Sequence, residues 1–175
     1  LQTAAELFAL RNEHMGTLAQ PNATSLFTAY TGSLYRFDQR YRHFCEAADD
    51  AESRDWDILK SLRKTIEQTY GNGFLTELAL AWNRHLENGL LKLWRLDGIP
   101  NQQAFYEREV APVLAKGPDR RVFVIISDAF RYEAAQELTA LLNGKYRFTA
   151  ELSAQLGVLP SYTRLGMAAL LPHQV

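Results

Sequence analysis

The stretch that decides the fold runs from Arg121 to Leu142 and reads RVFVIISDAFRYEAAQELTALL. Val122 to Ile126 is an unbroken run of β-branched and aromatic residues, which is typical of a strand buried on both faces of a parallel sheet. The residues from about Tyr132 to Leu142 predict a helix, which Asn143-Gly144 would end. Tyr146 to Ser153 then alternates between apolar and polar residues and predicts a second strand. Strand, helix and strand in this order indicate a right-handed parallel crossover.

The residues before this stretch show helical periodicity instead. Their clearest apolar stripe predicts a helix that begins at Ser33, its candidate N-cap, and consists of Leu34, Phe37, Tyr41, Phe44 and Ala48. Gly32 and Gly71-Asn72-Gly73 predict breaks between helices, and the acidic residues 48–55 predict a loop whose Asp55 caps the next helix. A last helix is expected from about Gln102 to Ala115, with an adjustment near Pro112.

Nothing in this part alternates with a period of two, so we expect residues 1–117 to form an all-helical domain with its aromatic stripes in the core. Residues 118–175 are expected to form the first part of an α/β domain. The predicted fold class is therefore α plus α/β, a helical bundle followed by the opening elements of an incomplete parallel sheet.

Composition narrows the classes of function. Apolar residues make up 47% and charged residues 22% of the chain, and the net charge of −1 gives no overall basic field for nucleic acid. The local basic cluster Arg36, Arg40, Arg42 and His43 is interpreted as a solvated helix face, with a binding role as the alternative. Cys45 is a lone cysteine, which excludes an internal disulfide and favours a reducing cytoplasm. No stretch has the length and apolar character of a membrane span, so we expect no membrane partner.

The residues that suggest chemistry follow the two predicted strands. Asp128 lies where the first strand ends, and the second strand delivers Ser161 and Thr163 to the same edge, just where a helix from Tyr162 to Leu170 is expected. An acid beside a hydroxyl at a helix N-terminus is the beginning of a metal-assisted phosphoryl-transfer site. On spacing alone, all three residues are also ordinary helix caps, and that alternative stays open.

Two motifs at this edge carry a family resemblance. VFVIISDAFRYEAAQEL, followed by LGVLPSYTRLGMAALLPH, resembles the PglZ family, a branch of the alkaline phosphatase superfamily, and the helical segment YRFDQRYRHF is similar to the region before the PglZ core. The resemblance implies that the predicted sheet is the start of an alkaline phosphatase-like domain.

The same resemblance implies roles for individual residues. Asp128 would be the first metal ligand, and Thr163 would be the nucleophile, its oxygen also meeting the metal, with Ser161 the less favoured choice. Arg164 and Arg131 would approach the substrate phosphate or hold the site in shape. Members of the superfamily hold one or two divalent ions, commonly zinc. PglZ proteins act in phage growth limitation and BREX anti-phage systems alongside a DNA methyltransferase and other subunits. The substrate of such an enzyme would be a phosphomonoester, a phosphodiester such as nucleic acid, or a phosphorylated or nucleotidylated protein.

The superfamily's remaining Asp and His ligands lie well downstream of the nucleophile, whereas this chain ends at Val175. We interpret His173 as a loop residue, and expect the chain to be inactive alone and to bind no metal alone. One hypothesis is therefore a piece of a metal-dependent phosphohydrolase. The alternative is a non-catalytic scaffold whose helical region docks other BREX proteins while Asp128 and Thr163 only cap structure. The third is a helical bundle with an α/β appendage and no chemistry.

Overall fold

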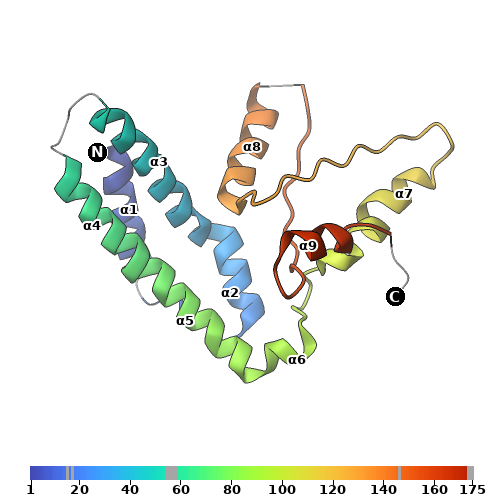
Figure 1. The fold of residues 1–175 in the computed structure, drawn as a ribbon, viewed down its shortest axis with the longest axis horizontal. Coiled ribbons are helices and arrows are strands. Elements are labelled where there is room, and N and C mark those ends of the chain that lie inside the picture. The colour runs from blue at the N-terminus through green and yellow to red at the C-terminus, as the bar shows by residue number, and fades with distance from the viewer. Residues whose placement is uncertain (15, 17, 54–58, 146, 173–175) are drawn as a thin grey trace. The chain divides into compact units, whose positions relative to one another are not determined.

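The computed structural model describes residues 1–175 except 15, 17, 54–58, 146 and 173–175 (Figure 1). The predicted cap Asp55 and the loop residue His173 therefore lie outside the described residues. The chain divides into two compact units. The first unit contains Leu1–Leu93 and Tyr132–Leu138, and the second contains Trp94–Arg131 and Thr139–Val175. The domain boundary expected after residue 117 stays a prediction.

The first unit is helical, as its periodicity predicts. The order along the chain is α1 (Gln2–Glu13), α2 (Ala23–Ala29), η1 (Tyr30–Leu34), α3 (Tyr35–Glu52), α4 (Lys60–Tyr70), η3 (Gly71–Leu75), α5 (Thr76–His85), η4 (Leu86–Leu90) and α6 (Leu91–Leu93), in which η1, η3 and η4 are short turns of π-helix that join the helices on either side of them. The helix α1 packs against α3 and α4 (Figure 1).

Three of the predicted breaks in this unit are wrong. The chain passes from α2 to α3 through η1 and from α4 to α5 through η3, and both turns stay helical although they contain glycines. Gly71 has a φ of −68° and a ψ of −54°, so it keeps the helical conformation instead of ending it. Ser33 does not cap a helix, because its hydroxyl donates to the carbonyl of Ala29 at 3.4 Å inside the continuous turn. The acidic segment predicted as a loop is helical as far as Glu52, the last residue of α3.

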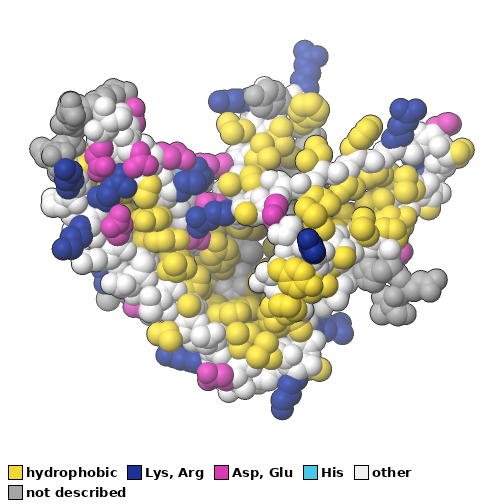
Figure 2. Space-filling view, viewed as in Figure 1, with side chains coloured by type: hydrophobic (Ala, Val, Ile, Leu, Met, Phe, Trp, Pro, Cys, Tyr) yellow, Lys and Arg dark blue, Asp and Glu magenta, His cyan; other side chains and the backbone are white. Residues whose placement is uncertain are grey.

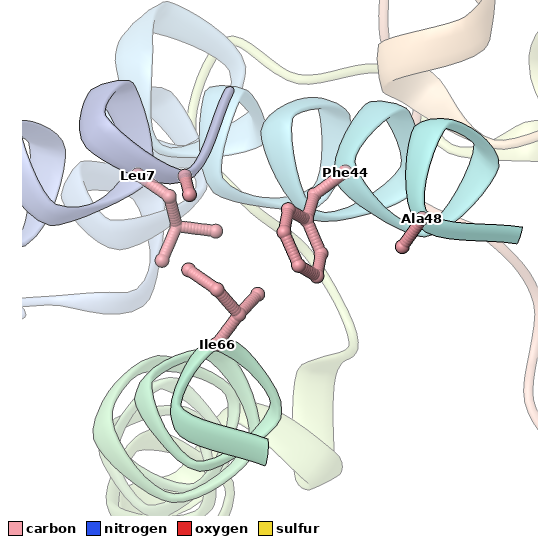
Figure 3. Close-up of a cluster of buried hydrophobic side chains, with 5 residues drawn as sticks. Leu7, Phe44, Ala48 and Ile66 are labelled. Atoms are coloured by element: carbon pink, nitrogen blue, oxygen red, sulfur yellow. The ribbon is translucent and has the colours of Figure 1, made fainter. Parts of the chain in front are cut away.

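The core sits where the predicted stripe of α3 meets α1 and α4. Figure 3 shows Leu7 of α1, Phe44 and Ala48 of α3 and Ile66 of α4 pointing toward one another. Leu7 and Ile66 are completely buried, and Phe44 is 2% exposed. Burial of such side chains removes apolar surface from water and contributes about 1.5–3 kcal/mol for each large residue. The interpretation of this stripe as core is therefore confirmed.

A second cluster contains a buried acid held by two tyrosines. The ring of Phe37 stacks on Phe74 with centroids 4.1 Å apart. Asp38 is only 4% exposed. Its carboxylate accepts hydrogen bonds from the hydroxyls of Tyr30 and Tyr70, each at 2.5 Å. Because a buried carboxylate is costly without donors, the two hydroxyls explain how this acid lies in the core.

The second unit contains little regular structure before α8. Its elements there are the 3₁₀ turn η5 (Gln102–Ala104), the π-turn η6 (Tyr106–Val110) and α7 (Ala111–Leu114). The helix predicted for residues 102–115 is therefore present, and a π-turn provides the adjustment expected near Pro112. The helix α8 (Tyr132–Lys145) runs past Asn143-Gly144, so this pair does not end it as predicted. The last helix, α9 (Thr163–Ala169), forms where expected.

The two predicted strands are not formed within the described part of the chain, where only isolated bridges pair Leu96 with Ile99 and Asn101 with Leu156. Residues 122–126 are extended loop in Figure 1, and Phe123 and Ile125 are 86% and 92% exposed. A strand requires a neighbouring strand to complete its hydrogen bonds. The backbone N–H and carbonyl of Ala150 instead bond to the side-chain amide of Asn143, at 2.9 and 2.8 Å.

The surface of the helical unit carries both signs of charge. Figure 2 shows basic and acidic side chains intermingled over α3 and α4. An example is Arg63, which pairs with Asp49 at 2.5 Å and with Glu52 at 3.0 Å. In the part of the chain that the structure describes, no helix has the length and hydrophobicity needed to cross a membrane.

Candidate functional site

The candidate site begins at Asp128, which follows the apolar run 122–126. One carboxylate oxygen, Oδ1, accepts a hydrogen bond from the backbone N–H of Ala129 at 3.0 Å. Ala129 has a φ of +55°, in the left-handed region that non-glycine residues seldom adopt. Because α8 begins only at Tyr132, Asp128 does not occupy the cap position of that helix. The other oxygen, Oδ2, faces the second part of the site.

The second part is Thr163, the first residue of α9. Its hydroxyl Oγ1 donates to Oδ2 of Asp128 at 3.1 Å, across 35 positions of sequence. The N-cap position of α9 belongs to Tyr162, which makes no side-chain hydrogen bond to the helix. The alternative that Thr163 merely caps a helix is therefore not what this geometry shows. Its hydroxyl proton is directed at the Asp128 carboxylate. The lone pairs of the hydroxyl oxygen are therefore free to contact an electrophile or an ion.

Both residues line a hollow of about 330 Å³. Ser161 lies on the same wall, so the structure brings together three of the five residues expected at the site. Arg131 and Arg164 are exposed, and neither is among the residues found to line the hollow. The described residues that line the hollow are Gln102, Ile126, Ser127, Asp128, Gly157, Val158, Ser161, Tyr162, Thr163, Gly166, Met167 and Leu170.

Sequence reasoning missed Gln102 and Trp94, which support this wall. The Gln102 amide Nε2 donates to the carbonyl of Gly166 at 2.9 Å, and its Oε1 accepts from the N–H of Val158 at 3.1 Å. The Trp94 indole N–H donates to the carbonyl of Gly157 at 2.7 Å. These contacts join positions more than fifty residues apart, and no local pattern in the sequence signals them.

Sequence reasoning also missed the ion pairs of α8 within the helical unit. Arg42 on α3 pairs with Glu137 and, at 3.4 Å, with the completely buried Glu133, while His43 lies 2.5 Å from Glu137. Burial alone raises the pKa of Glu137, but the hydrogen bond from Arg42 and the charge of His43 outweigh it and hold that pKa below its ordinary value. Arg42 and His43, which we interpreted as part of a solvated face, are therefore partly buried and ion-paired within the helical unit.

The donor set of the hollow suits a divalent cation in part. Oδ2 of Asp128 and Oγ1 of Thr163 are two oxygen donors within hydrogen-bond distance of each other. Among the residues described, no three His, Cys, Asp or Glu side chains gather closely enough to hold an ion by themselves. These two residues therefore fit as part of a ligand set, and further ligands would have to complete it.

A family model and two curated relatives point to the same kind of protein. Residues 105–175 match the family model described as the BREX system PglZ alkaline phosphatase-like domain. The chain is 47% identical over 175 residues to alkaline phosphatase-like protein BrxZ of Escherichia coli O9:H4 (strain HS), covering 99% of this chain and 20% of that protein. It is 38% identical over 174 residues to alkaline phosphatase-like protein PglZ of Bacillus cereus (strain H3081.97), with the same coverage. The chain thus spans about a fifth of the length of these relatives. No solved structure matches it.

Proposed function

Because the chain belongs to the PglZ family of BREX-system proteins, we propose that it forms part of a metal-dependent phosphohydrolase of the alkaline phosphatase type. In this proposal the helical unit precedes the catalytic core, and residues 122–126 and 147–153 become strands when further strands of a parallel sheet pair with them. The exposed apolar side chains of Phe123 and Ile125 support this, since such a run is buried on both faces in a parallel sheet.

The observation that carries the proposal is the contact between Thr163 and Asp128. A threonine hydroxyl that donates to a carboxylate at 3.1 Å has its proton held on one side and its lone pairs presented on the other. This is the arrangement expected of a nucleophilic hydroxyl that an adjacent carboxylate activates. We assign Thr163 as the nucleophile and Asp128 as the first metal ligand. Ser161 is the less favoured nucleophile, because no hydrogen bond links it to Asp128 in the described part of the chain.

The proposed reaction proceeds in two displacements. Oγ1 of Thr163 forms a bond to phosphorus while the bond from phosphorus to the leaving oxygen breaks. The hydroxyl proton passes from Thr163 to solvent, and the departing oxygen takes a proton from solvent. Water then attacks the phosphothreonine, which releases the phosphate product and restores the hydroxyl. The substrate class is a phosphate monoester or a phosphodiester such as nucleic acid.

One or two divalent ions, with zinc favoured, would be held by Asp128, by the oxygen of Thr163 and by ligands beyond this chain. When bound, such an ion lowers the pKa of the hydroxyl and neutralises charge on the phosphoryl oxygens. Arg131 and Arg164 are assigned to substrate phosphate or to holding the site in shape. Their exposed positions mean that substrate or the remainder of the protein must approach them for either role.

Other BREX subunits, including a DNA methyltransferase, are the proposed partners, and the cytoplasm is the proposed location. One observation favours the alternative of a docking scaffold. The helical unit has an apolar hollow of about 220 Å³, lined by Leu26, Phe27, Tyr30, Leu78 and Trp82. These side chains are buried or partly buried, and a hollow lined by apolar side chains can receive an apolar side chain of a partner. The two functions are compatible, because docking and catalysis would use different units of the chain.

The proposal is tested on the full-length parent protein. Zinc content and hydrolysis of bis-p-nitrophenyl phosphate are measured for the wild type, Thr163→Ala, Asp128→Ala and the control Ser161→Ala. We expect Thr163→Ala to lose hydrolysis while it retains its fold, Asp128→Ala to lose metal as well as hydrolysis, and Ser161→Ala to stay active. A metal-free, inactive wild type would replace this proposal with the scaffold alternative.

A further inference from the structure

Gln102 joins the two segments that flank the proposed nucleophile. Its Oε1 accepts a hydrogen bond from the N–H of Val158, five positions before Thr163, and its Nε2 donates to the carbonyl of Gly166, three positions after it. The planar amide of Gln102 therefore fixes the distance between the loop that leads to α9 and the first turn of α9. Gln102 also lines the hollow that Thr163 lines, so this connection lies in the wall of the candidate site.

The backbone of the same segment is anchored independently of its side chain. The N–H of Gln102 donates to the carbonyl of Leu156 at 2.8 Å, and the N–H of Leu156 donates to the carbonyl of Pro100 at 2.8 Å. The resulting parallel bridge between Asn101 and Leu156 holds the Gln102 side chain in register with the loop. Asn101 donates from its own side chain to the carbonyl of Trp94 at 3.1 Å.

The Gln102 amide lies close to two glycines of the loop and of α9. A Cβ added at Gly157 would meet Oε1 of Gln102 at 3.7 Å, and one added at Gly166 would meet Nε2 at 3.5 Å. Both are ordinary van der Waals distances, so the amide packs beside the loop and beside α9 without a clash. Trp94 fixes Gly157 from a second direction through its indole N–H. The loop and the helix start are consequently held by polar groups on both sides of Thr163.

We propose that Gln102 is a positioning residue for phosphoryl transfer, which acts through Val158 and Gly166 to hold Thr163 Oγ1 at Asp128. It contacts neither reacting atom, so its effect is on alignment instead of on chemistry. A displacement of about 1 Å in a nucleophile costs on the order of 10²-fold in rate, because the attacking oxygen and the phosphorus lose their alignment. This inference rests on the proposed function, since it assumes that Thr163 is the nucleophile.

The test uses the full-length parent with bis-p-nitrophenyl phosphate as substrate. Gln102→Glu keeps the acceptor for Val158 but places an oxygen where Nε2 donates to Gly166, and Gln102→Ala removes both bonds. Gln103→Ala is the matched control, because it changes the same residue type at an exposed neighbouring position. We expect both Gln102 variants to lower kcat, by about 10²-fold for Gln102→Ala, with KM nearly unchanged and zinc content retained. Gln103→Ala should equal the wild type.

Amide hydrogen exchange of the peptide that spans residues 156–166 provides a readout independent of activity. Both Gln102 variants should exchange faster there than the wild type, and Gln103→Ala should not. Should Gln102→Ala fail to fold, Gln102→Glu and Trp94→Phe, which removes only the indole N–H bond to Gly157, carry the test.

Unchanged exchange would overturn the inference, and so would faster exchange with an unchanged kcat. A wild-type parent with no hydrolysis would overturn the proposed function and the role of Gln102 in it, while the exchange result would still decide whether Gln102 holds the loop.

Discussion

Arg42 is one of the residues that tie the first half of α8 into the helical unit, and its removal gives a sharp test of that arrangement. Its Nε lies 3.4 Å from Oε1 of Glu133, whose side chain is completely buried, and its other nitrogens pair with Glu137 and with Glu46. The change Arg42→Met keeps the apolar stem of the side chain and removes the charge. Glu133 then remains buried without its guanidinium.

The magnitude follows from the burial of the partners. Removing one member of a buried ion pair costs about 3–5 kcal/mol, because the other charge stays desolvated. Arg42 itself keeps 27% of its side chain exposed. Water therefore reaches part of the site, and we expect a loss of about 3 kcal/mol in the free energy of unfolding. With a typical urea dependence of about 2 kcal/mol per molar, the midpoint of unfolding falls by about 1.5 M.

The assay is urea unfolding of the 175-residue chain, followed by circular dichroism at 222 nm. Glu46→Gln is the control, because its side chain is 64% exposed and such a pair contributes at most about 0.5 kcal/mol. Adding Glu133→Gln to Arg42→Met should recover at least about 1.5 kcal/mol by removing the buried negative charge of Glu133. The reasoning is refuted if Arg42→Met costs less than about 1 kcal/mol, or if the second change recovers nothing.

Two further predictions concern the helical unit. Gly71→Ala should stabilise the chain by about 0.4–1 kcal/mol, because Gly71 has helical angles and open space where a Cβ would lie. Gly89→Ala should destabilise the chain, since Gly89 has a φ of +110°. Thermal unfolding compares the two variants, and destabilisation by both would contradict the continuous turn η3. Glu137 has a pKa held below its ordinary value of 4.5, so its contribution to stability is present above about pH 4.5 and is lost as the pH falls through its folded-state pKa. Glu137→Gln should therefore flatten the acid side of the stability profile between pH 5 and pH 3 (about the range over which such a group titrates), and an unchanged acid slope would show that Glu137 is not the group responsible.

The helical half of the fold could be predicted because its signal is local. The stripe through Phe37 and Phe44 recurs at helical spacing, and the structure buries it as that spacing requires. The breaks at Gly32 and Gly71 could not be predicted correctly, because glycine permits a turn without enforcing one. At both positions the helix continues through a π-turn. Local propensity does not predict the extra residue of such a turn.

The site could be predicted in part for a similar reason. Asp128 and Thr163 stand out because each follows a recognisable change of pattern, and the structure does place them in contact. Their strands are not formed here, because strand pairing depends on partners at a distance and Ala150 finds its hydrogen bonds in the Asn143 side chain instead. Gln102 could not be predicted, since its meaning lies in bonds to Val158 and Gly166, more than fifty positions away.

The central claim is that Thr163 and Asp128 form the working pair of a phosphohydrolase. The most direct measurement is the mass of the full-length protein after rapid acid quenching during turnover of bis-p-nitrophenyl phosphate, for the wild type and for Thr163→Ala. The account predicts that the wild type carries a nitrophenyl phosphate adduct on the peptide containing Thr163, and that Thr163→Ala carries none and does not hydrolyse the substrate. Undiminished hydrolysis by Thr163→Ala, or an adduct on another residue such as Ser161, would contradict it.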